Sequence, residues 1–208
     1  MKTRKRETRI TAAPAITGKC GWVFCLLGAL LLTMMSTPAK AQCTAQNTAF
    51  QSGEHVMYDL YFNWKFIWKK VGLASLTTFS TTYQSQPAYR FNLLSVGSKK
   101  TDFFFKMRDT LTCYVSEKLE PLYFRKAAEE GDRYTVDEAW FSYKDGVSNV
   151  KQRRIWHNPV RDPQEMEYSD SRCIFDMLSI LAQARSYDPA DYKIGDRIFF
   201  PLSTGVHV

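Results

Sequence analysis

The chain has few residues that could perform catalysis. Only three histidines occur among its 208 residues, and none lies in a nucleophile motif such as G-x-S-x-G. No C-x-x-C pair is present, which argues against a redox motif or a zinc knuckle, and no run of alternating Asp and Asn suggests a calcium loop. We therefore assign no catalytic residue, no metal ligand and no cofactor, and we favour a protein that is not an enzyme.

Paired carboxylates are the remaining route to hydrolysis, because glycoside cleavage needs two acids that face each other across a cleft. The acidic residues that could serve all fall in predicted turns or loops, where a solvated side chain is the simpler interpretation. A hydrolase of the cell envelope that uses loop carboxylates stays an alternative. Its candidates are Glu129, Glu130, Asp132, Glu165 and Glu167.

The first 41 residues have the three parts of a secretory signal peptide. Six basic residues from Lys2 to Lys19 precede an apolar stretch at residues 21–35, and Ala39-Lys40-Ala41 supplies the small residues of a cleavage site. The apolar stretch would span about 22 Å as a helix, less than the roughly 30 Å of a bilayer core, so it is short for an anchor. We predict cleavage before Gln42 and a periplasmic or otherwise extracytoplasmic location.

Loss of this leader changes the charge of the protein. The whole chain has a net charge of +7, whereas residues 42–208 carry 21 basic and 20 acidic side chains. Such a balance gives no basis for nucleic-acid binding, which depends on clustered positive charge. The remaining 167 residues suit one domain, and their 28 aromatic residues favour strands and a core of large side chains.

Three cysteines follow the leader: Cys43, Cys113 and Cys173. An oxidising compartment would allow one disulfide and one free thiol. The simpler expectation is three isolated cysteines, two of them buried as small hydrophobic residues. The sequence leaves the pairing open.

Alternating apolar residues predict a series of strands. Glu129-Glu130-Gly131-Asp132 and Lys144-Asp145-Gly146 separate later runs as hairpin turns do, and Gly72 with Ala74 indicates close approach of another backbone or a bulge. Asn158-Pro159 and Asp162-Pro163 predict a loop. We expect strands at residues 56–63, 71–79, 89–96, 110–115, 122–127, 134–143, 147–156 and 197–202.

One helix should follow the strands, with Asp170 or Ser171 as its N-cap, and should end at Arg185. We predict a mostly β fold: an antiparallel meander curled into an open or partial barrel, with this helix of the C-terminal half packed on it. Substitution of Leu181 by aspartate should destabilise the fold severely, because an unpaired carboxylate would be buried. The predicted buried stripe of the helix consists of Cys173, Met177, Ile180, Leu181 and Ala184.

Two segments combine basic and aromatic residues. Residues 151–157 could hold a phosphate or a stacked ring, but basic residues on an edge strand, which block unwanted pairing, are the simpler interpretation. Lys99 and Lys100 precede three phenylalanines at 103–105, and an exposed apolar cluster often marks contact with lipid or with a partner. The simpler interpretation of this second segment is that it lines the core.

Several short motifs after the leader resemble those of the bacterial exported family known as domain of unknown function 3108. The resemblance covers essentially all of residues 42–208; it implies an extracytoplasmic, β-rich domain and brings no catalytic residues. The motifs are Gly53-Glu54 with Tyr58, Val71-Gly72, Arg108-Asp109-Thr110-Leu111, Leu119-Glu120-Pro121-Leu122-Tyr123, Asp176-Met177-Leu178-Ser179 and Gly195-Asp196.

Members of that family usually continue with several more strands after the Gly-Asp turn, whereas this chain ends at Val208. We therefore expect a single domain at residues 42–208 that lacks its last strands. Its strand at 197–202 would then be an unpaired, apolar edge and would favour aggregation.

These observations favour a non-enzymatic module of the cell envelope that binds a lipid-like or amphipathic ligand or a partner protein. The alternatives are the carboxylate hydrolase and an outer-membrane β-barrel, which the predicted helix and the C-terminal His207-Val208 disfavour. We expect no nucleic-acid partner and no stable membrane span after cleavage, and the oligomeric state stays open.

Overall fold

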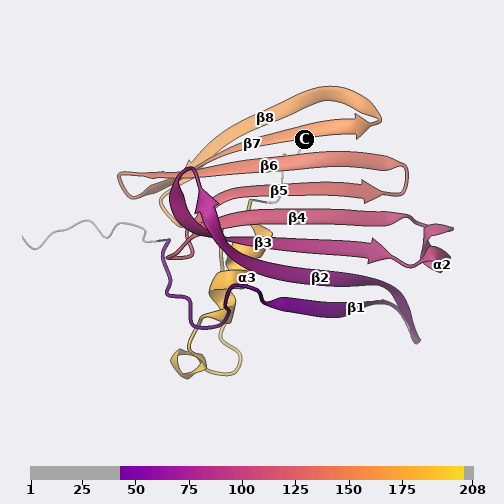
Figure 1. The fold of residues 1–208 in the computed structure, drawn as a ribbon, viewed down its shortest axis with the longest axis horizontal. Coiled ribbons are helices and arrows are strands. Elements are labelled where there is room, and N and C mark those ends of the chain that lie inside the picture. The colour runs from indigo at the N-terminus through magenta and orange to yellow at the C-terminus, as the bar shows by residue number, and fades with distance from the viewer. Residues whose placement is uncertain (1–42, 204–208) are drawn as a thin grey trace, which may run out of the picture. The chain divides into compact units, whose positions relative to one another are not determined.

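A computed structural model describes residues 43–203 (Figure 1). Over this range the chain forms one antiparallel sheet of eight strands, each hydrogen-bonded to the next in sequence order, with β1 and β8 at its two edges. The predicted open antiparallel meander is confirmed, while the predicted leader lies outside the described residues. The strands are β1 (His55–Trp64), β2 (Ile67–Tyr83), β3 (Gln86–Gly97), β4 (Met107–Ser116), β5 (Pro121–Glu130), β6 (Arg133–Lys144), β7 (Val147–Asn158) and β8 (Val160–Asp170).

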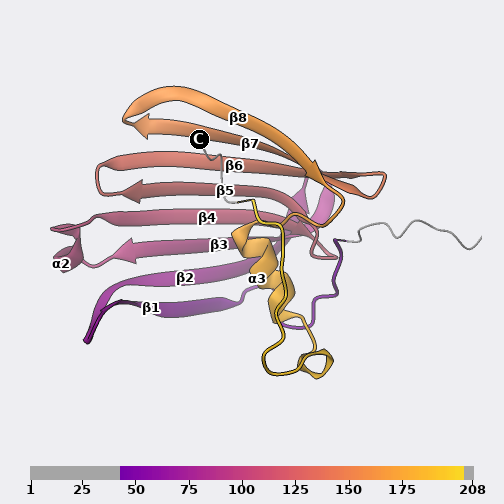
Figure 2. The ribbon, with the colours of Figure 1, turned by 180° about the vertical axis from the view of Figure 1, so that it is seen from behind.

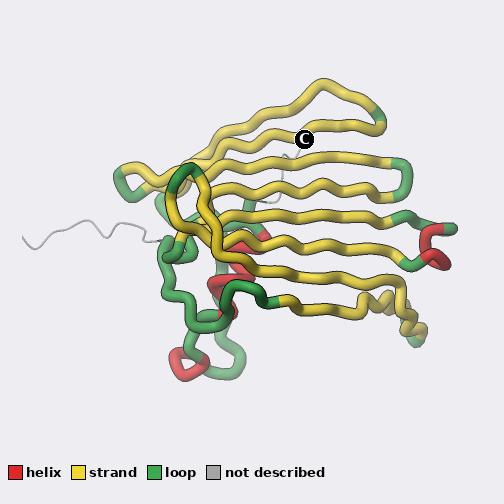
Figure 3. Tube along the Cα trace, in the orientation of Figure 1, coloured by secondary structure: helices red, strands yellow, loops and turns green. Residues whose placement is uncertain are grey.

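The two predicted hairpin turns form, for a conformational reason, but Glu129 and Glu130 belong to β5 and not to the turn. Asp145 and Gly146, between β6 and β7, both have positive φ, at 55° and 79°. Two such residues form the turn whose twist matches the twist of the flanking strands, and Asp-Gly is among the pairs that adopt it readily. Gly131, between β5 and β6, also has a positive φ of 60°. The turns between successive strands lie at the two ends of the sheet, as Figure 3 shows in green.

The predicted loop at residues 158–163 is wrong. β7 continues to Asn158, the Asn158–Pro159 peptide bond is cis, and β8 returns from Val160 along β7. Pro163 lies in an edge strand, where the pairing shifts register between Arg154 and Trp156. Edges and bulges are the two places where a sheet tolerates proline. A strand therefore forms although the local sequence suggests a break.

The sheet has two faces, and α3 (Met177–Arg185) covers part of one of them (Figures 1 and 2). We call this the helix face. Its residues are directly paired across neighbouring strands, so that one apolar layer runs from β2 to β7. The other side is called the outer face below. The buried core of the helix face includes Leu76, Phe91, Leu111, Cys113, Phe124, Ala139, Phe141 and Val150 of the sheet, with Ile174, Leu178 and Ala182 above it.

The helix begins at a later residue than predicted. Its N-cap is Asp176, whose carboxylate accepts hydrogen bonds from the N–H groups of Leu178 (2.8 Å) and Ser179 (2.9 Å). The Ser179 hydroxyl accepts in return from the N–H of Asp176, which completes a capping box. The predicted start at Asp170 or Ser171 is therefore wrong.

The later start changes which side of the helix is buried. Leu178 and Ala182 are 2% and 1% exposed, whereas Met177 and Leu181 are 46% and 40% exposed. The predicted stripe through Met177 and Leu181 is wrong, and the burial of Leu181 on which the severe effect of Leu181→Asp was based is not observed. The N-cap is Asp176, which lies further along the chain than the predicted one, and its position sets a different helical register.

No strand forms at residues 197–202. The segment instead runs beside the residues that precede α3, where the N–H of Phe175 donates to the carbonyl of Pro201 (3.0 Å) and the N–H of Ser203 donates to the carbonyl of Phe175 (2.7 Å). The ring of Phe200 packs edge-on against that of Phe175, with centroids 5.6 Å apart. The last strand of the described sheet is β8, so the predicted exposed edge at 197–202 is wrong.

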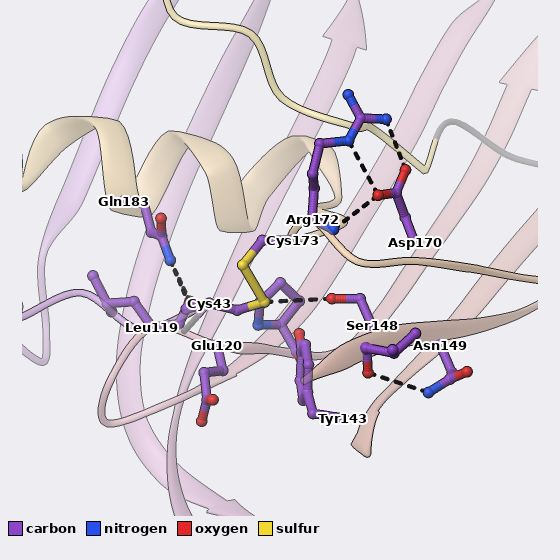
Figure 4. Close-up of a disulfide and its surroundings, with 12 residues drawn as sticks. Cys43, Leu119, Glu120, Tyr143, Ser148, Asn149, Asp170, Arg172, Cys173 and Gln183 are labelled. Carbon is purple, nitrogen blue, oxygen red and sulfur yellow. Dashed lines mark hydrogen bonds and ion pairs between the residues drawn. A yellow bond between two sulfur atoms is a disulfide. The ribbon is translucent and has the colours of Figure 1, made fainter. Parts of the chain in front are cut away.

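Cys43 and Cys173 form a disulfide, with their Cα atoms 5.2 Å apart (Figure 4). The expectation of three isolated cysteines is therefore wrong, although Cys113 is free and buried as expected of a small hydrophobic residue. The amide of Gln183 on α3 donates to the carbonyls of Cys43 (2.8 Å) and Leu119 (3.3 Å). The segment before β1 is thus tied both to the segment after β8 and to the helix.

Candidate functional site: a lysine-rimmed groove

The hairpin of β1 and β2 and the connection between β3 and β4 lie side by side at one end of the sheet, on the right in Figure 1. The connection contains α2 (Lys99–Asp102), a single turn capped by Ser98, whose hydroxyl accepts a hydrogen bond from the N–H of Thr101. The N–H of Ser98 and the hydroxyl of Thr101 both donate to the carbonyl of Val71, at 2.7 and 3.1 Å. These bonds fix α2 against β2.

A groove of about 410 Å³ opens where α2 meets β2. That volume is within the range of small-molecule sites, and the lining is mainly apolar, as such sites usually are. The buried glycines and the apolar side chains form its floor, while the lysines are exposed and form its rim. We call it the lysine-rimmed groove. It is lined by Lys70, Gly72, Leu73, Val96, Gly97, Ser98, Lys99 and Lys100.

The two glycines allow the close packing that shapes this floor. A Cβ atom at Gly72 would lie 2.3 Å from the carbonyl oxygen of Val96, and one at Gly97 would lie 3.1 Å from a carboxylate oxygen of Asp102. The first distance is impossible without a shift of the backbone. The close approach predicted at Gly72 is confirmed, and any larger residue there would push β2 away from β3.

An exposed apolar strip continues from the groove along the outer face. Leu73 and Val96 are direct cross-strand partners, and Leu94 lies two residues from Val96 on the same face. Met57 pairs with Ser75, the partner of Leu94, and so joins the same strip. Met57, Leu73 and Leu94 are all exposed. The groove therefore opens onto apolar surface that could hold an extended hydrocarbon chain.

The rim carries positive charge that the surroundings only partly neutralise. Lys70 forms an ion pair with Asp59 at 2.6 Å, but neither Lys99 nor Lys100 has an ion-pair partner within residues 43–203. The nearest acid on their own helix, Asp102, is bound by both terminal nitrogens of Arg108. That guanidinium lowers the pKa of Asp102, so its negative charge is already compensated.

Phe103 and Phe104 are 86% and 83% exposed, so the interpretation of this segment as core-lining is wrong for both residues. Their rings pack edge-on against each other, with centroids 5.1 Å apart. The tip of the β1–β2 hairpin, at the same end of the sheet as α2, carries exposed Phe66 and Trp68, which lie between the predicted strands and were not singled out. The sequence feature that could have identified these two residues is the run of aromatic residues and lysines at 61–70, in which apolar and polar residues do not alternate regularly.

The five candidate carboxylates do not converge on one cleft. Glu129 and Glu130 are successive residues of β5 and therefore point to opposite faces, where they pair with Lys106 (2.5 Å) and Lys126 (3.3 Å). Glu165 and Glu167 lie in β8 rather than in a loop, each 3.6 Å from the ammonium group of Lys151, and Asp132 lies in the exposed β5–β6 turn. Their arrangement offers no acid and base across a substrate.

The basic run at residues 151–157 belongs to β7, which is an interior strand, so the edge-strand interpretation is wrong. Arg154 binds both carboxylate oxygens of the buried Asp137 on the helix face, at 2.5 and 3.0 Å. Lys151 and Arg153 face acidic residues of β8. The run is thus neutralised by the strands on either side.

A mixed-charge cluster crosses the helix face beyond α3. Lys126 of β5 lies directly opposite Asp137 of β6, and Arg154 of β7 lies opposite Asp137 on its other side. Asp109 of β4 completes the cluster, and burial, with a smaller effect of the negative charge of Glu130, raises its pKa. Because most of these charges are matched by neighbours, we interpret the cluster as structural.

Two further properties concern only the described part of the chain. Residues 43–203 contain no group of three or more His, Cys, Asp or Glu side chains placed to hold a metal ion. Within the same range no helix is long and apolar enough to cross a bilayer.

No curated protein and no solved structure is significantly similar to this chain. The family described as protein of unknown function (DUF3108) matches residues 57–206. The matched range contains β2 to β8, α2, α3 and every residue that lines the lysine-rimmed groove. The chain belongs to the DUF3108 family of proteins of unknown function.

Proposed function

We propose that this protein is a non-enzymatic module that binds an anionic amphipathic ligand in the lysine-rimmed groove. The observation that carries the proposal is an apolar groove of about 410 Å³ whose rim holds Lys99 and Lys100 without a neutralising partner in the described chain. Charged groups of one sign around an apolar floor match a ligand with an anionic head and a hydrocarbon tail.

In this arrangement the head group, a phosphate or a carboxylate, lies between the ammonium groups of Lys99 and Lys100. The hydrocarbon tail lies on Leu73 and Val96 and follows the exposed strip toward Leu94. Removal of apolar surface from water would contribute roughly 25 cal/mol per Å², which makes the tail the main source of affinity. The lysines then select the head group.

Binding rather than catalysis is favoured by the groups that line the groove. Its one hydroxyl, that of Ser98, accepts from the N–H of Thr101 and lies 2.7 Å from the Thr101 hydroxyl, so it serves to cap α2. The lining contains no carboxylate, histidine or cysteine that could act as a base or a nucleophile.

We also propose that the protein works outside the cytoplasm. The disulfide between Cys43 and Cys173 supports this, because such bonds form and persist mainly in oxidising compartments. Cys43 lies just after the predicted cleavage site and would therefore stay with the exported part.

Calorimetric titration with two amphiphiles of equal chain length tests the proposal. Dodecyl phosphate, kept below its micellar concentration, should bind at least tenfold more tightly than dodecyl maltoside. The Lys99→Ala/Lys100→Ala variant should lose this preference. Lys144→Ala removes another exposed lysine, at the opposite end of the sheet, and should retain the preference. Equal affinity for the two head groups, or an unchanged preference in the double variant, would refute the proposal.

A further inference from the structure

The aromatic side chains at the groove end of the sheet are unusually exposed. Phe66 is 88% and Trp68 is 69% exposed at the β1–β2 hairpin, and Phe103 and Phe104 are exposed on the α2 connection at the same end of the sheet. Large apolar side chains that gather on one surface of a soluble domain mark a contact with a partner or a membrane. These four residues define what we call the docking end.

The opposite end of the sheet provides an internal comparison. Its turns consist of polar residues and glycine: Gln84-Ser85, Glu117-Lys118 and Asp145-Gly146. Exposed aromatic tips are therefore a property of one end and not of the loops of this sheet in general. Figure 1 places the docking end on the right, away from α3.

Lysines surround these aromatic residues. The hairpin segment 61–70 and the connection 98–106 together contain six lysines and a single acidic residue, Asp102, which Arg108 already binds. Two of the six, Lys70 and Lys106, form ion pairs with Asp59 and Glu129 outside these segments. Lys65 directly precedes Phe66 in the sequence, and Lys99 and Lys100 lie a few residues before Phe103. Aromatic rings favour the interfacial layer of a bilayer, and clustered lysines are attracted to anionic lipid head groups.

We propose that the docking end binds the surface of an anionic lipid bilayer, with Phe66, Trp68, Phe103 and Phe104 in the interfacial layer and the lysines against the head groups. The charge complementarity selects an anionic bilayer over a zwitterionic one. The lysine-rimmed groove lies beside these loops and would face the membrane, so the bilayer is the source of the ligand. This last point rests on the proposed function, whereas the docking itself rests on the aromatic tips.

Co-sedimentation with vesicles tests the docking. The protein should bind vesicles of phosphatidylcholine with 30% phosphatidylglycerol at least tenfold more strongly than vesicles of phosphatidylcholine alone. The Phe66→Ser/Phe104→Ser variant should reduce the partition coefficient at least tenfold. Both side chains are largely exposed, so the melting temperature should not change. Phe199→Ser is the matched control: it removes an 84% exposed phenylalanine outside the docking end and should bind like the unmodified protein.

Two readouts separate this proposal from the proposed function. The Phe66→Ser/Phe104→Ser variant leaves every groove-lining residue in place and should still bind monomeric dodecyl phosphate. Unchanged vesicle binding by this variant, or an equal loss in Phe199→Ser, would overturn the docking while leaving the groove intact. The unmodified protein could also bind vesicles but fail to bind dodecyl phosphate, while the Phe66→Ser/Phe104→Ser variant loses vesicle binding. That result would support the docking and refute the groove as a ligand site.

Discussion

Removal of the disulfide between Cys43 and Cys173 should take away a large part of the stability of the fold. The bond joins residues 130 positions apart. Closure of a loop of that length lowers the entropy of the unfolded chain by an amount equivalent to about 5 kcal/mol at 25 °C, and disulfides commonly contribute roughly 2–4 kcal/mol. We therefore expect the Cys43→Ala/Cys173→Ala variant to lose about 3 kcal/mol or more, with a melting temperature lower by about 10 °C.

Native hydrogen bonds near the disulfide should keep the destabilisation of the Cys43→Ala/Cys173→Ala variant from exceeding this amount. The carbonyl of Cys43 still accepts from Gln183, and the N–H of Ala45 still donates to the carbonyl of Lys118 (2.8 Å). The variant should thus fold, with its N-terminal segment held less tightly.

Urea unfolding followed by tryptophan fluorescence measures the difference. Dithiothreitol should lower the stability of the unmodified protein to that of the double variant and should leave the variant itself unchanged. A difference below about 1 kcal/mol between the oxidised protein and the variant would refute the reasoning, because loop closure would then contribute little.

Two further predictions concern α3. Leu178→Asp should reduce the free energy of unfolding by at least about 3 kcal/mol because it buries a carboxylate, whereas Leu181→Asp should change it by less than about 1 kcal/mol; similar effects in chemical denaturation would contradict the observed helix register. Burial raises the pKa of Asp176 to about 6, above its value in the unfolded chain. Protonation of Asp176 therefore stabilises the fold fully below about pH 4, and this stabilisation is lost as the pH rises through 6. The loss amounts to about 3 kcal/mol of the free energy of unfolding between pH 4 and 7, and it should be absent in Asp176→Asn. Identical pH profiles of the variant and the unmodified protein would show that Asp176 titrates normally.

The strands and hairpins of this protein could be predicted because their causes are local. Alternation places Leu76 on one face and Leu73 on the other, and Asp145-Gly146 adopts the turn conformation by itself. β8 was missed because Pro159, Pro163 and the charged residues near them suggest a loop. It forms because β7 offers a free edge, which is a property of the sheet and not of residues 160–170.

The remaining errors have a common physical reason. The register of α3 depends on Phe175, which is held extended by residues more than twenty positions later, and the disulfide joins two segments separated by the entire sheet. The exposure of Phe103 and Phe104 depends on what packs beside them, so the sequence could identify the aromatic and basic segment but not its position at the surface. The groove itself requires the meeting of Gly72 and Gly97, which are partners on different strands.

The central claim is that an anionic amphiphile binds in the lysine-rimmed groove, and a titration with dodecyl phosphate monitored by ¹H–¹⁵N nuclear magnetic resonance tests it most directly. The account predicts saturable shifts that are largest at the amides of Gly72, Gly97 and Lys100, with the amides of α3 unaffected. Shifts centred on the helix face around Leu178, or spread evenly over the sheet with Gly97 and Lys100 unchanged, would contradict it.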